Sequence, residues 1–276
     1  MDRRLTPFSG RAALEVLRGQ VEAVFVPGEV GAVAVPLADL CASPGGARDR
    51  QVALGEALVV IDRRDDTQTG GAVFVQMAKD GYCGWLDAAA VGPALAATHW
   101  VAAAGTHLYP EPRVQARAVA ALPFGARLAV TGMQGHWAEV AGGYVPAVHL
   151  RAAGDMFHDP VAVAEMFLGT PYLWGGNSRD GIDCSGLVQA ALLACGRACP
   201  GDSDQQAGLG MPLAEGAALR RGDLLFWKGH VAMVVDGARL IHANGHSMSV
   251  CHEGIAACID RIAAAGGGPV TARRRL

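Results

Sequence analysis

The sequence predicts an α+β protein in which two small β-barrels precede a domain that mixes helices and strands. Two observations predict this arrangement. The first half of the chain repeats a pattern of short strands and glycine turns, whereas the second half places helical segments before three strand-like segments. With 276 residues, of which 51% are apolar and 18% charged, the chain is long enough for two or three packed domains.

The repeat in the first half is faint but keeps a regular order. Its first copy contains LCASPGGARDRQVALGEALVVID and GAVFVQMAKDGYCGWLDAAAV, and its second contains LYPEPRVQARAVAALPFGARLAVTG and HWAEVAGGYVPAVHL. In each copy a glycine, Gly55 or Gly125, precedes a strand, and a Gly-Tyr turn ending at Tyr82 or Tyr144 leads into another. Short strands at regular spacing indicate small barrels. The repeat is equally compatible with barrels that bind a ligand and with barrels that only pack.

These patterns divide the chain into three predicted domains. Residues 1–93 hold an N-terminal segment and the first barrel, residues 94–153 the second barrel, and residues 154–276 the mixed domain. The segment RAAGDMFHDP (151–160) is predicted to be a linker because its glycine and proline interrupt regular structure.

The mixed domain starts with a helix predicted in VAVAEMFLGT, which we expect to end at Gly169. Further on, RRGDLLFWKGHVAMVVDGARLIHANGH is predicted to form three strands. The turns between them are expected at Lys228-Gly229 and at Asp236-Gly237, because glycine accepts the backbone angles of tight turns.

Charge and hydropathy exclude several classes of partner. The net charge is −3 and no run of Lys and Arg occurs, so we expect neither nucleic acid nor an anionic membrane surface as a partner. No apolar stretch is long enough for a membrane span. The opening MDRRLTPFSGRAALEVLRGQ lacks the apolar core of a secretory signal, which predicts a cytoplasmic protein. We expect a monomer.

The seven cysteines are odd in number and irregularly spaced, which predicts reduced thiols rather than a disulfide framework. Cys195 and Cys199 form a CxxxC, but no second pair stands at the spacing of a zinc site. We therefore expect no metal and no cofactor.

Cys184 is the cysteine whose position predicts reactivity. It follows Asp183, a good helix cap, and precedes SGLVQAALLAC, in which apolar residues recur at helical spacing. A thiol in the first turn of a helix meets unpaired N–H groups and the positive end of the helix dipole, and both favour the thiolate. Cys195 stands at the opposite end of the same helix. The alternative is that Cys184 is an inert packing residue.

Two histidines on the predicted strands could supply a base. His230 opens HVAMVV and His242 stands in LIHAN, on either side of the Asp236-Gly237 turn. A three-residue loop there would put both rings on one face of the hairpin, directly opposite or one diagonal apart, with Gly237 supplying a positive φ. Two such rings can hydrogen-bond, so that one fixes the tautomer of the other. The alternative is a pair of unrelated strand histidines.

These residues resemble a known family. GTPYLWGGNSRDGIDCSGLV, RRGDLLFWKGHVAMVVD and LIHANG are similar to the NlpC family of papain-like cysteine peptidases, over roughly residues 155–250. The upstream repeat resembles tandem bacterial SH3-like domains, which cytoplasmic members of the family carry. The resemblance implies an α+β fold: a papain-like cysteine peptidase domain preceded by two small SH3-like β-barrels.

The resemblance also implies roles at matching positions. Cys184 matches the nucleophile, His230 the general base and His242 the polar residue that orients the base. The backbone N–H of Cys184 would help to form the oxyanion site, with Tyr172 assisting. The implied reaction is cleavage of γ-D-glutamyl bonds to a diamino acid in murein peptides. Asn244 is an alternative orienting residue.

In the two-barrel members a free N-terminal L-Ala is held by acidic and polar groups. The matching positions here are Asp183, Ser185, Ser203 and Trp174 in the mixed domain, and Glu56 and Tyr82 in the first barrel. A buried ammonium needs carboxylates, and Asp183 and Glu56 would provide two. The alternatives are an exposed strand-edge charge for Glu56 and a turn tyrosine covering the barrel end for Tyr82.

The sequence departs from larger members in the short gap of 46 residues between Cys184 and His230, which predicts a trimmed loop near KGH. Taken together, the sequence predicts a cysteine endopeptidase that recycles cell-wall peptides, with a murein tripeptide or related peptide as its partner. An exported wall hydrolase anchored by SH3-like domains, or a non-catalytic murein-peptide-binding module, are the alternatives.

Overall fold

A computed structural model describes residues 1–65 and 70–276 of the chain. The chain divides into two compact units, Met1–Asp155 and Met156–Leu276. The boundary between these units falls inside the segment 151–160 that the sequence predicts as a linker.

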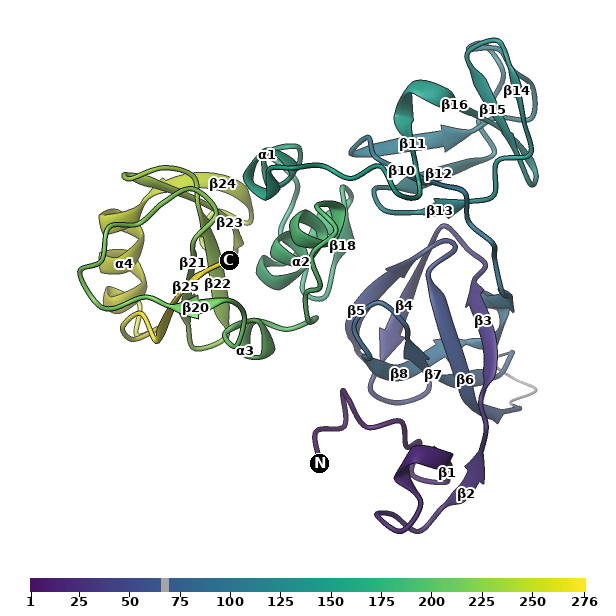
Figure 1. Cartoon of the computed structure of the whole chain (residues 1–276), viewed down its shortest axis with the longest axis horizontal. Coiled ribbons are helices and arrows are strands. Elements are labelled where there is room, and N and C mark those ends of the chain that lie inside the picture. Colours follow the sequence, from purple (N-terminus) through teal and green to yellow (C-terminus); the bar gives the residue numbers. More distant parts are fainter. Residues whose placement is uncertain (66–69) are drawn as a thin grey trace. The chain divides into compact units, whose positions relative to one another are not determined.

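The first barrel is a seven-stranded antiparallel sheet in the order β5-β4-β8-β7-β6-β3-β9 (Figure 1). Its core consists of apolar side chains that alternate along the strands, as the pattern in GAVFVQM predicts. The strands are β3 (Glu29–Val33), β4 (Leu37–Cys41), β5 (Arg48–Ala53), β6 (Ala57–Arg64), β7 (Ala72–Met77), β8 (Cys83–Asp87) and β9 (Val91–Pro93), and the 3-10 turn η2 (Ala88–Ala90) precedes β9.

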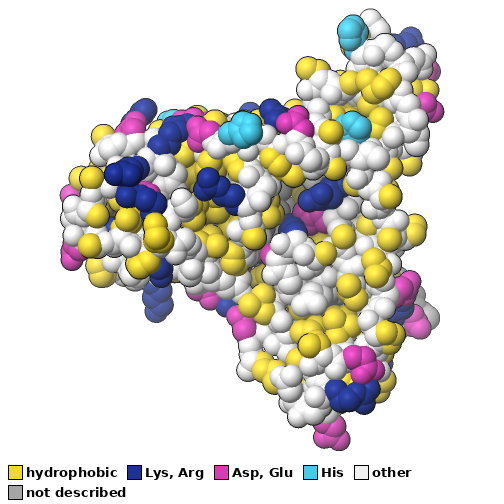
Figure 2. Space-filling view, in the orientation of Figure 1, with side chains coloured by type: hydrophobic (Ala, Val, Ile, Leu, Met, Phe, Trp, Pro, Cys, Tyr) yellow, Lys and Arg dark blue, Asp and Glu magenta, His cyan; other side chains and the backbone are white. Residues whose placement is uncertain are grey.

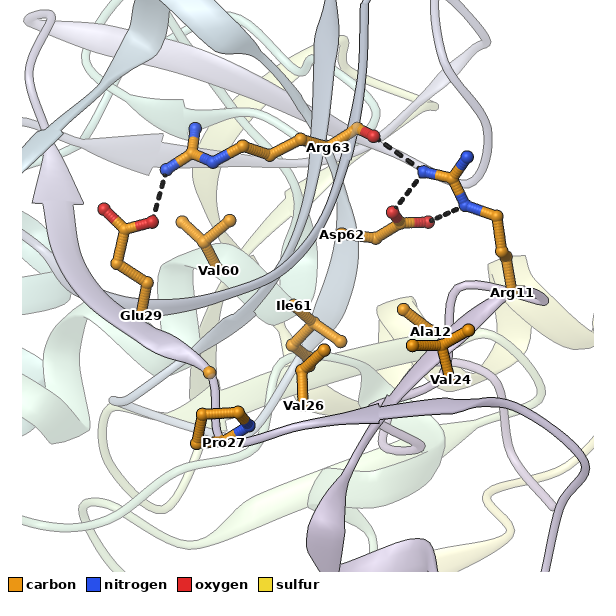
Figure 3. A pocket seen from close by; sticks show the side chains of 11 residues that line it. Arg11, Ala12, Val24, Val26, Pro27, Glu29, Val60, Ile61, Asp62 and Arg63 are labelled. Carbon is orange, nitrogen blue, oxygen red and sulfur yellow. Dashed lines mark hydrogen bonds and ion pairs between the residues drawn. The ribbon is translucent and has the colours of Figure 1, made fainter.

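An N-terminal segment packs against this sheet. It holds the short parallel pair β1 (Ala12–Leu14) and β2 (Val24–Val26), with η1 (Glu15–Leu17) between them. Figure 3 shows Arg11 of this segment reaching Asp62 at the end of β6, beside a groove lined mainly by apolar side chains. Burial raises the pKa of Asp62, but hydrogen bonds from Arg11 and Ser9 outweigh it and hold the pKa below its usual value. The pair therefore ties the segment to the barrel.

The following strands form three small sheets around a separate core, in the orders β13-β10-β17, β11-β12 and β14-β15-β16. Ala126, which stands where the first copy of the repeat has Glu56, is fully buried in this core. The elements are β10 (His99–Val101), β11 (Gly105–Leu108), β12 (Ala120–Pro123), β13 (Arg127–Leu128), β14 (Gly132–Gln134), β15 (Trp137–Val140), β16 (Gly143–Pro146), η3 (Ala147–His149) and β17 (Leu150–Ala152).

The second unit is built on a six-stranded sheet in the order β20-β25-β21-β22-β23-β24. Figure 1 shows α4 on one side of this sheet and α1 and α2 on the other. The strands are β20 (Met211–Pro212), β21 (Leu224–Trp227), β22 (His230–Val234), β23 (Arg239–Asn244), β24 (Ser249–Gly254) and β25 (Ala272–Arg275). The other elements are α1 (Pro160–Glu165), the short pair β18 (Asn177–Ser178) and β19 (Gly181–Ile182), α2 (Cys184–Ala194), α3 (Ser203–Gln206) and α4 (Ile255–Ala264).

The three predicted strands are present as β21, β22 and β23, but the first helix differs from the prediction. It ends at Glu165 instead of continuing to Gly169. The backbone N–H groups of Met166, Phe167 and Leu168 each bond to the carbonyl three residues earlier, so the chain tightens into turns. Gly169 then takes a positive φ of 79°.

The β22–β23 hairpin has the register that the sequence predicts, but glycine does not supply its turn. Met233 pairs with Ile241 and Val234 with Leu240, which leaves a loop centred on Gly237. The φ of Gly237 lies outside the left-handed region, so the expectation of a positive φ there is wrong. The Asp236 carboxylate closes the loop instead, by accepting hydrogen bonds from the N–H groups of Ala238 (3.0 Å) and Arg239 (2.9 Å).

On the face shown in Figure 2, basic and acidic side chains are interspersed and do not gather into one large patch of either sign. Within residues 1–65 and 70–276, no helix has the length and apolar character needed to cross a membrane.

Two glycines on neighbouring turns provide a matched test of this geometry. Gly229, between β21 and β22, has a φ of 74°, and neither Gly229 nor Gly237 has atoms within 4 Å of an added Cβ. We expect Gly229→Ala to lower the free energy of unfolding by about 1–2 kcal/mol, because a side chain is strained at positive φ. Gly237→Ala should change it by less than about 0.5 kcal/mol. Urea unfolding of both variants measures this, and equal losses would contradict the described turn.

Candidate active site

Cys184 is the first residue of α2, and its side chain is buried with 6% exposed. Asp183 caps the helix, because its Oδ1 accepts a hydrogen bond from the Gly186 N–H at 2.6 Å. Leu187, Val188 and other apolar residues of α2 are buried, as their spacing predicts. The local sequence therefore places this thiol at the N-terminus of a packed helix.

The position of Cys184 does not make it a thiolate by itself. Burial, together with the neighbouring Asp183 carboxylate, raises the pKa of Cys184 to about 12. Hydrogen bonds from backbone N–H groups, including that of Val231 on β22, lower this pKa but do not outweigh burial. The backbone N–H groups at the helix start thus favour the thiolate as expected, but burial outweighs them and the thiol needs a proton acceptor.

The structure brings the two histidines together. Extending the β22–β23 register places His230 and His242 one diagonal apart on the same face of the hairpin. His230 Nε2 lies 2.9 Å from His242 Nδ1, within hydrogen-bonding distance. This bond occupies one ring nitrogen of His230 and leaves only Nδ1 to serve as a base.

Both imidazoles are held neutral. Burial lowers the pKa of His230 to about 3, and positive charge on His242 or Arg261 would lower it as well. Burial also lowers the pKa of His242 to about 4, although Glu253 opposes this effect. A neutral His230 can accept a proton, which is the state that a general base requires.

Glu253 and Arg261 continue the chain of contacts beyond His242. Glu253 Oε2 lies 3.1 Å from His242 Nε2, and the Arg261 guanidinium bonds both carboxylate oxygens at 2.8 and 2.7 Å. The sequence analysis missed both residues. Strand alternation after the β23–β24 turn could have indicated Glu253. His242 pairs with Cys251 on β24, and Glu253 is the next residue of β24 whose side chain points to the same face of the sheet.

Several predicted binding residues surround the thiol. Asp183 Oδ1 also accepts from the Ser185 hydroxyl at 3.1 Å, and Asp183 Oδ2 accepts from the Gly175 N–H at 2.9 Å. Tyr172 lies close enough for Cys184 and Asp183 to affect its titration. Burial and these two neighbours raise the pKa of Tyr172 to about 12, so its hydroxyl stays a hydrogen-bond donor.

The remaining two predicted residues of the second unit differ in burial. Ser203 opens α3 and is half-buried, whereas Trp174 is 68% exposed. A buried residue that the sequence analysis missed, Gln206, joins α3 to α2 by donating to the Ser185 carbonyl at 2.9 Å. No periodic or motif signal marks Gln206 in the sequence. Asn244 caps the β23–β24 turn through bonds to the His246 and Ser247 N–H groups and is not the orienting residue.

Glu56 and Tyr82 belong to the first unit. The Glu56 carboxylate already forms an ion pair with an ammonium group of the protein. Lys79 Nζ lies 2.7 Å from Glu56 Oε1, and both side chains are 11% exposed. Glu56 is thus not the exposed edge charge of the alternative reading. Tyr82 is 2% exposed in the barrel core, and the Arg50 guanidinium lies over its ring. Substrate contacts by Glu56 and Tyr82 stay predictions.

One cluster of potential metal ligands occurs among the described residues. His242, Glu253 and Cys258 each offer a ligand atom, and these atoms lie within 4.8 Å of one another. The Arg261 guanidinium contacts both Glu253 and Cys258, the latter at 3.7 Å. A cation of the protein itself therefore occupies the position that a metal would need, and the residues do not fit a metal site.

The second unit is a papain-like domain that holds a hydrogen-bonded histidine pair and a buried cysteine, and the Cys184 thiol accepts a hydrogen bond from the backbone of Val231, the residue after His230. Residues 169–258 match the NlpC/P60 family, and residues 40–91 match the bacterial dipeptidyl-peptidase SH3 domain. The chain therefore contains an NlpC/P60 domain and a bacterial SH3 domain. A second SH3-like domain in residues 94–153 stays a prediction.

Parts of known proteins are similar to part of this chain. The chain is 40% identical over 95 residues to a γ-D-glutamyl-L-lysine dipeptidyl-peptidase of Bacillus subtilis, covering 31% of each chain. It is 36% identical over 100 residues to the Bacillus cereus protein of the same name, covering 33% of this chain and 30% of the relative. The matches thus span about a third of the length of these relatives.

A crystal structure of an NlpC/P60 family protein from Bacillus cereus has the same fold, with a TM-score of 0.71. It covers 90% of this chain and 99% of its own length at 20% identity. At that identity the likeness concerns the fold. The predicted α+β class with a papain-like domain is confirmed.

The pairing of Cys184 with His230 can be tested without a substrate. We expect iodoacetamide to alkylate Cys184 at pH 7 at least about tenfold more slowly in His230→Ala, because the buried thiol then lacks a proton acceptor. Peptide mass spectrometry measures this directly, since the tryptic peptide of residues 180–197 also carries Cys195 as an internal control. An unchanged rate at Cys184 would show that His230 does not accept its proton.

Proposed function

We propose that this protein is a cysteine endopeptidase that cleaves the γ-D-glutamyl–diamino acid bond of murein peptides with a free N-terminal L-Ala. The observation that carries this proposal is the 2.9 Å bond between His230 Nε2 and His242 Nδ1, together with the hydrogen bond from the backbone of Val231, next to His230, to the Cys184 thiol at the start of α2. It leaves His230 Nδ1 as the acceptor for the Cys184 proton. This is the arrangement of a nucleophile, a base and a residue that orients the base.

The proposed reaction begins with transfer of the Cys184 proton to His230 Nδ1. The sulfur forms a bond to the γ-glutamyl carbonyl carbon, and the carbonyl oxygen becomes an oxyanion near the backbone N–H of Cys184 and the Tyr172 hydroxyl. The carbon–nitrogen bond then breaks, and the proton on Nδ1 goes to the departing amine. Water attacks the resulting thioester, its proton returns through Nδ1 to sulfur, and L-Ala-D-Glu leaves.

The names of the two Bacillus relatives support this choice of substrate, since both are γ-D-glutamyl-L-lysine dipeptidyl-peptidases. A free amino end would be recognised by carboxylates such as Asp183, and a capped substrate would offer no positive charge to them. We propose that Ser185, Ser203 and Trp174 contribute to the same pocket. Glu56 and Tyr82 are assigned to it by the resemblance alone.

We further propose that the protein works in the cytoplasm, on peptides released during cell-wall recycling. An exported hydrolase anchored through its SH3-like domain is the competing proposal. A non-catalytic binding module is disfavoured, because binding alone would not require the buried thiol and the hydrogen-bonded histidine pair to be kept together.

Cleavage of a defined peptide tests the reaction. We expect L-Ala-γ-D-Glu-meso-diaminopimelate to be split into L-Ala-D-Glu and the free diamino acid, and Cys184→Ala to abolish this. Cys195→Ala, at the C-cap of the same helix, is the matched control and should keep full activity. Mass spectrometry follows the products. Binding without cleavage by the wild-type protein would favour the binding module, and activity in Cys184→Ala would overturn the mechanism.

The free amino end is tested separately. The N-acetylated peptide should be cleaved at least about 100-fold less efficiently, because a buried carboxylate is left without its ammonium. Glu56→Gln should reduce this discrimination if Glu56 binds the amino end. Thermal unfolding of the variant is the control, since the change also leaves Lys79 without its counter-charge. Equal cleavage of both peptides by the wild type would contradict the proposed pocket for the free amino end.

A further inference from the structure

Three side chains form a diagonal row across neighbouring strands of the second unit. His230 on β22 lies diagonal to His242 on β23, and His242 lies diagonal to Glu253 on β24, because His242 pairs with Cys251. Diagonal neighbours on one face of a sheet are within reach of long side chains. His230 and His242 are hydrogen-bonded at 2.9 Å, and the Glu253 carboxylate lies 3.1 Å from His242 Nε2 as an ion-pair contact without hydrogen-bond geometry.

Arg261 binds Glu253, the last side chain of the row. It projects from α4, whose apolar side chains pack on the same sheet, and its guanidinium binds Glu253 at both oxygens. This pairing lowers the pKa of Glu253 to about 2, against burial, which raises it. Glu253 is therefore ionised throughout the neutral range and can only accept hydrogen bonds. The other titratable neighbour, Cys258, has a pKa raised to about 12 and stays neutral.

An ionised Glu253 decides where the protons of both histidines lie. His242 is neutral, so it carries one ring proton, and a carboxylate 3.1 Å from Nε2 favours the proton on that nitrogen. Nδ1 of His242 must then accept from Nε2–H of His230. His230 in turn has no proton on Nδ1, the nitrogen that remains for the thiol. The opposite arrangement would place a lone pair of His242 against the carboxylate and a proton on the atom that should act as the base.

We propose that Glu253, held by Arg261, is a positioning residue that sets the tautomers of His242 and His230 so that His230 Nδ1 is free to accept the Cys184 proton. This inference rests on the proposed peptidase function for its kinetic consequence, but not for its structural one. The competing explanation is that the Glu253–Arg261 pair only fastens α4 to β24.

Nitrogen-15 NMR of the histidine rings tests the proposal without any substrate. We expect His230 and His242 in the full-length protein to be protonated at Nε2 and unprotonated at Nδ1. The resonances are assigned by their loss in His230→Gln and His242→Gln. Glu253→Gln removes the negative charge beside His242 Nε2, so both rings should lose their preference for this tautomer and a fraction of each should carry the proton on Nδ1. A protonated Nδ1 on His242 in the wild type would overturn the proposal.

Kinetics provide the second readout. We expect Glu253→Gln to lower kcat at least about tenfold with KM nearly unchanged, because molecules with a proton on His230 Nδ1 lack the base while the binding groups are unaltered. Glu165→Gln is the matched control, since Glu165 also contacts a histidine, His252 at 3.2 Å, and an arginine, Arg221 at 3.5 Å. It should keep wild-type kcat.

The outcomes separate the two proposals. If the wild type cleaves no peptide but shows the expected tautomers, the proposed function fails and the positioning role stands. If Glu253→Gln keeps its kcat while its ring protons stay on Nε2, the pair only fastens the helix and the positioning role fails. If Glu253→Gln does not fold, Arg261→Lys serves as the second variant. Lysine keeps the positive charge but cannot bond both carboxylate oxygens of Glu253 in the same way, so this variant should lower kcat by a smaller factor with unchanged KM.

Discussion

The hydrogen bond between His230 and His242 is the interaction on which the rest of the candidate site depends. It exists because the β22–β23 loop has an odd number of residues, which places both rings on one face of the hairpin. Asp236 fixes that loop through its side chain. A one-residue change in register would turn one ring to the opposite face and end the contact. The chemistry therefore depends on a loop that contains none of the reacting groups.

Burial is the second constraint, and it shifts the pKa values of Cys184 and His230 in opposite directions. It raises the pKa of Cys184 and lowers that of His230, so each group alone is neutral. In the proposed reaction, transfer of the proton from the thiol to the imidazole would create both charges together, so that each would compensate the other. Asp183 works against the thiolate while it caps the helix, which shows that the helix start orients the cysteine more than it ionises it.

The candidate site was predictable where its residues follow local patterns. Cys184 after a capping residue, and two histidines on either side of an Asp-Gly turn, are visible in the sequence because helix caps and hairpins involve neighbouring residues. Glu253, Arg261 and Gln206 were missed because their partners come from other elements. Likewise, nothing in the sequence shows that Lys79 forms an ion pair with Glu56, since the two residues are 23 positions apart in the chain.

The sequence by itself determined the order of the elements, short strands followed by a mixed domain, and the start of a helix at Cys184. These depend on periodicity and turn chemistry, which act over a few residues. The papain-like fold was predicted from the resemblance of its motifs to a known family. Only the tertiary structure decided the protonation states, the Glu253–Arg261 pair behind His242, and the place of Tyr82 in the barrel core. The reason is that burial and ion pairing are set by side chains that distant segments bring together, and these interactions have no signature along the chain.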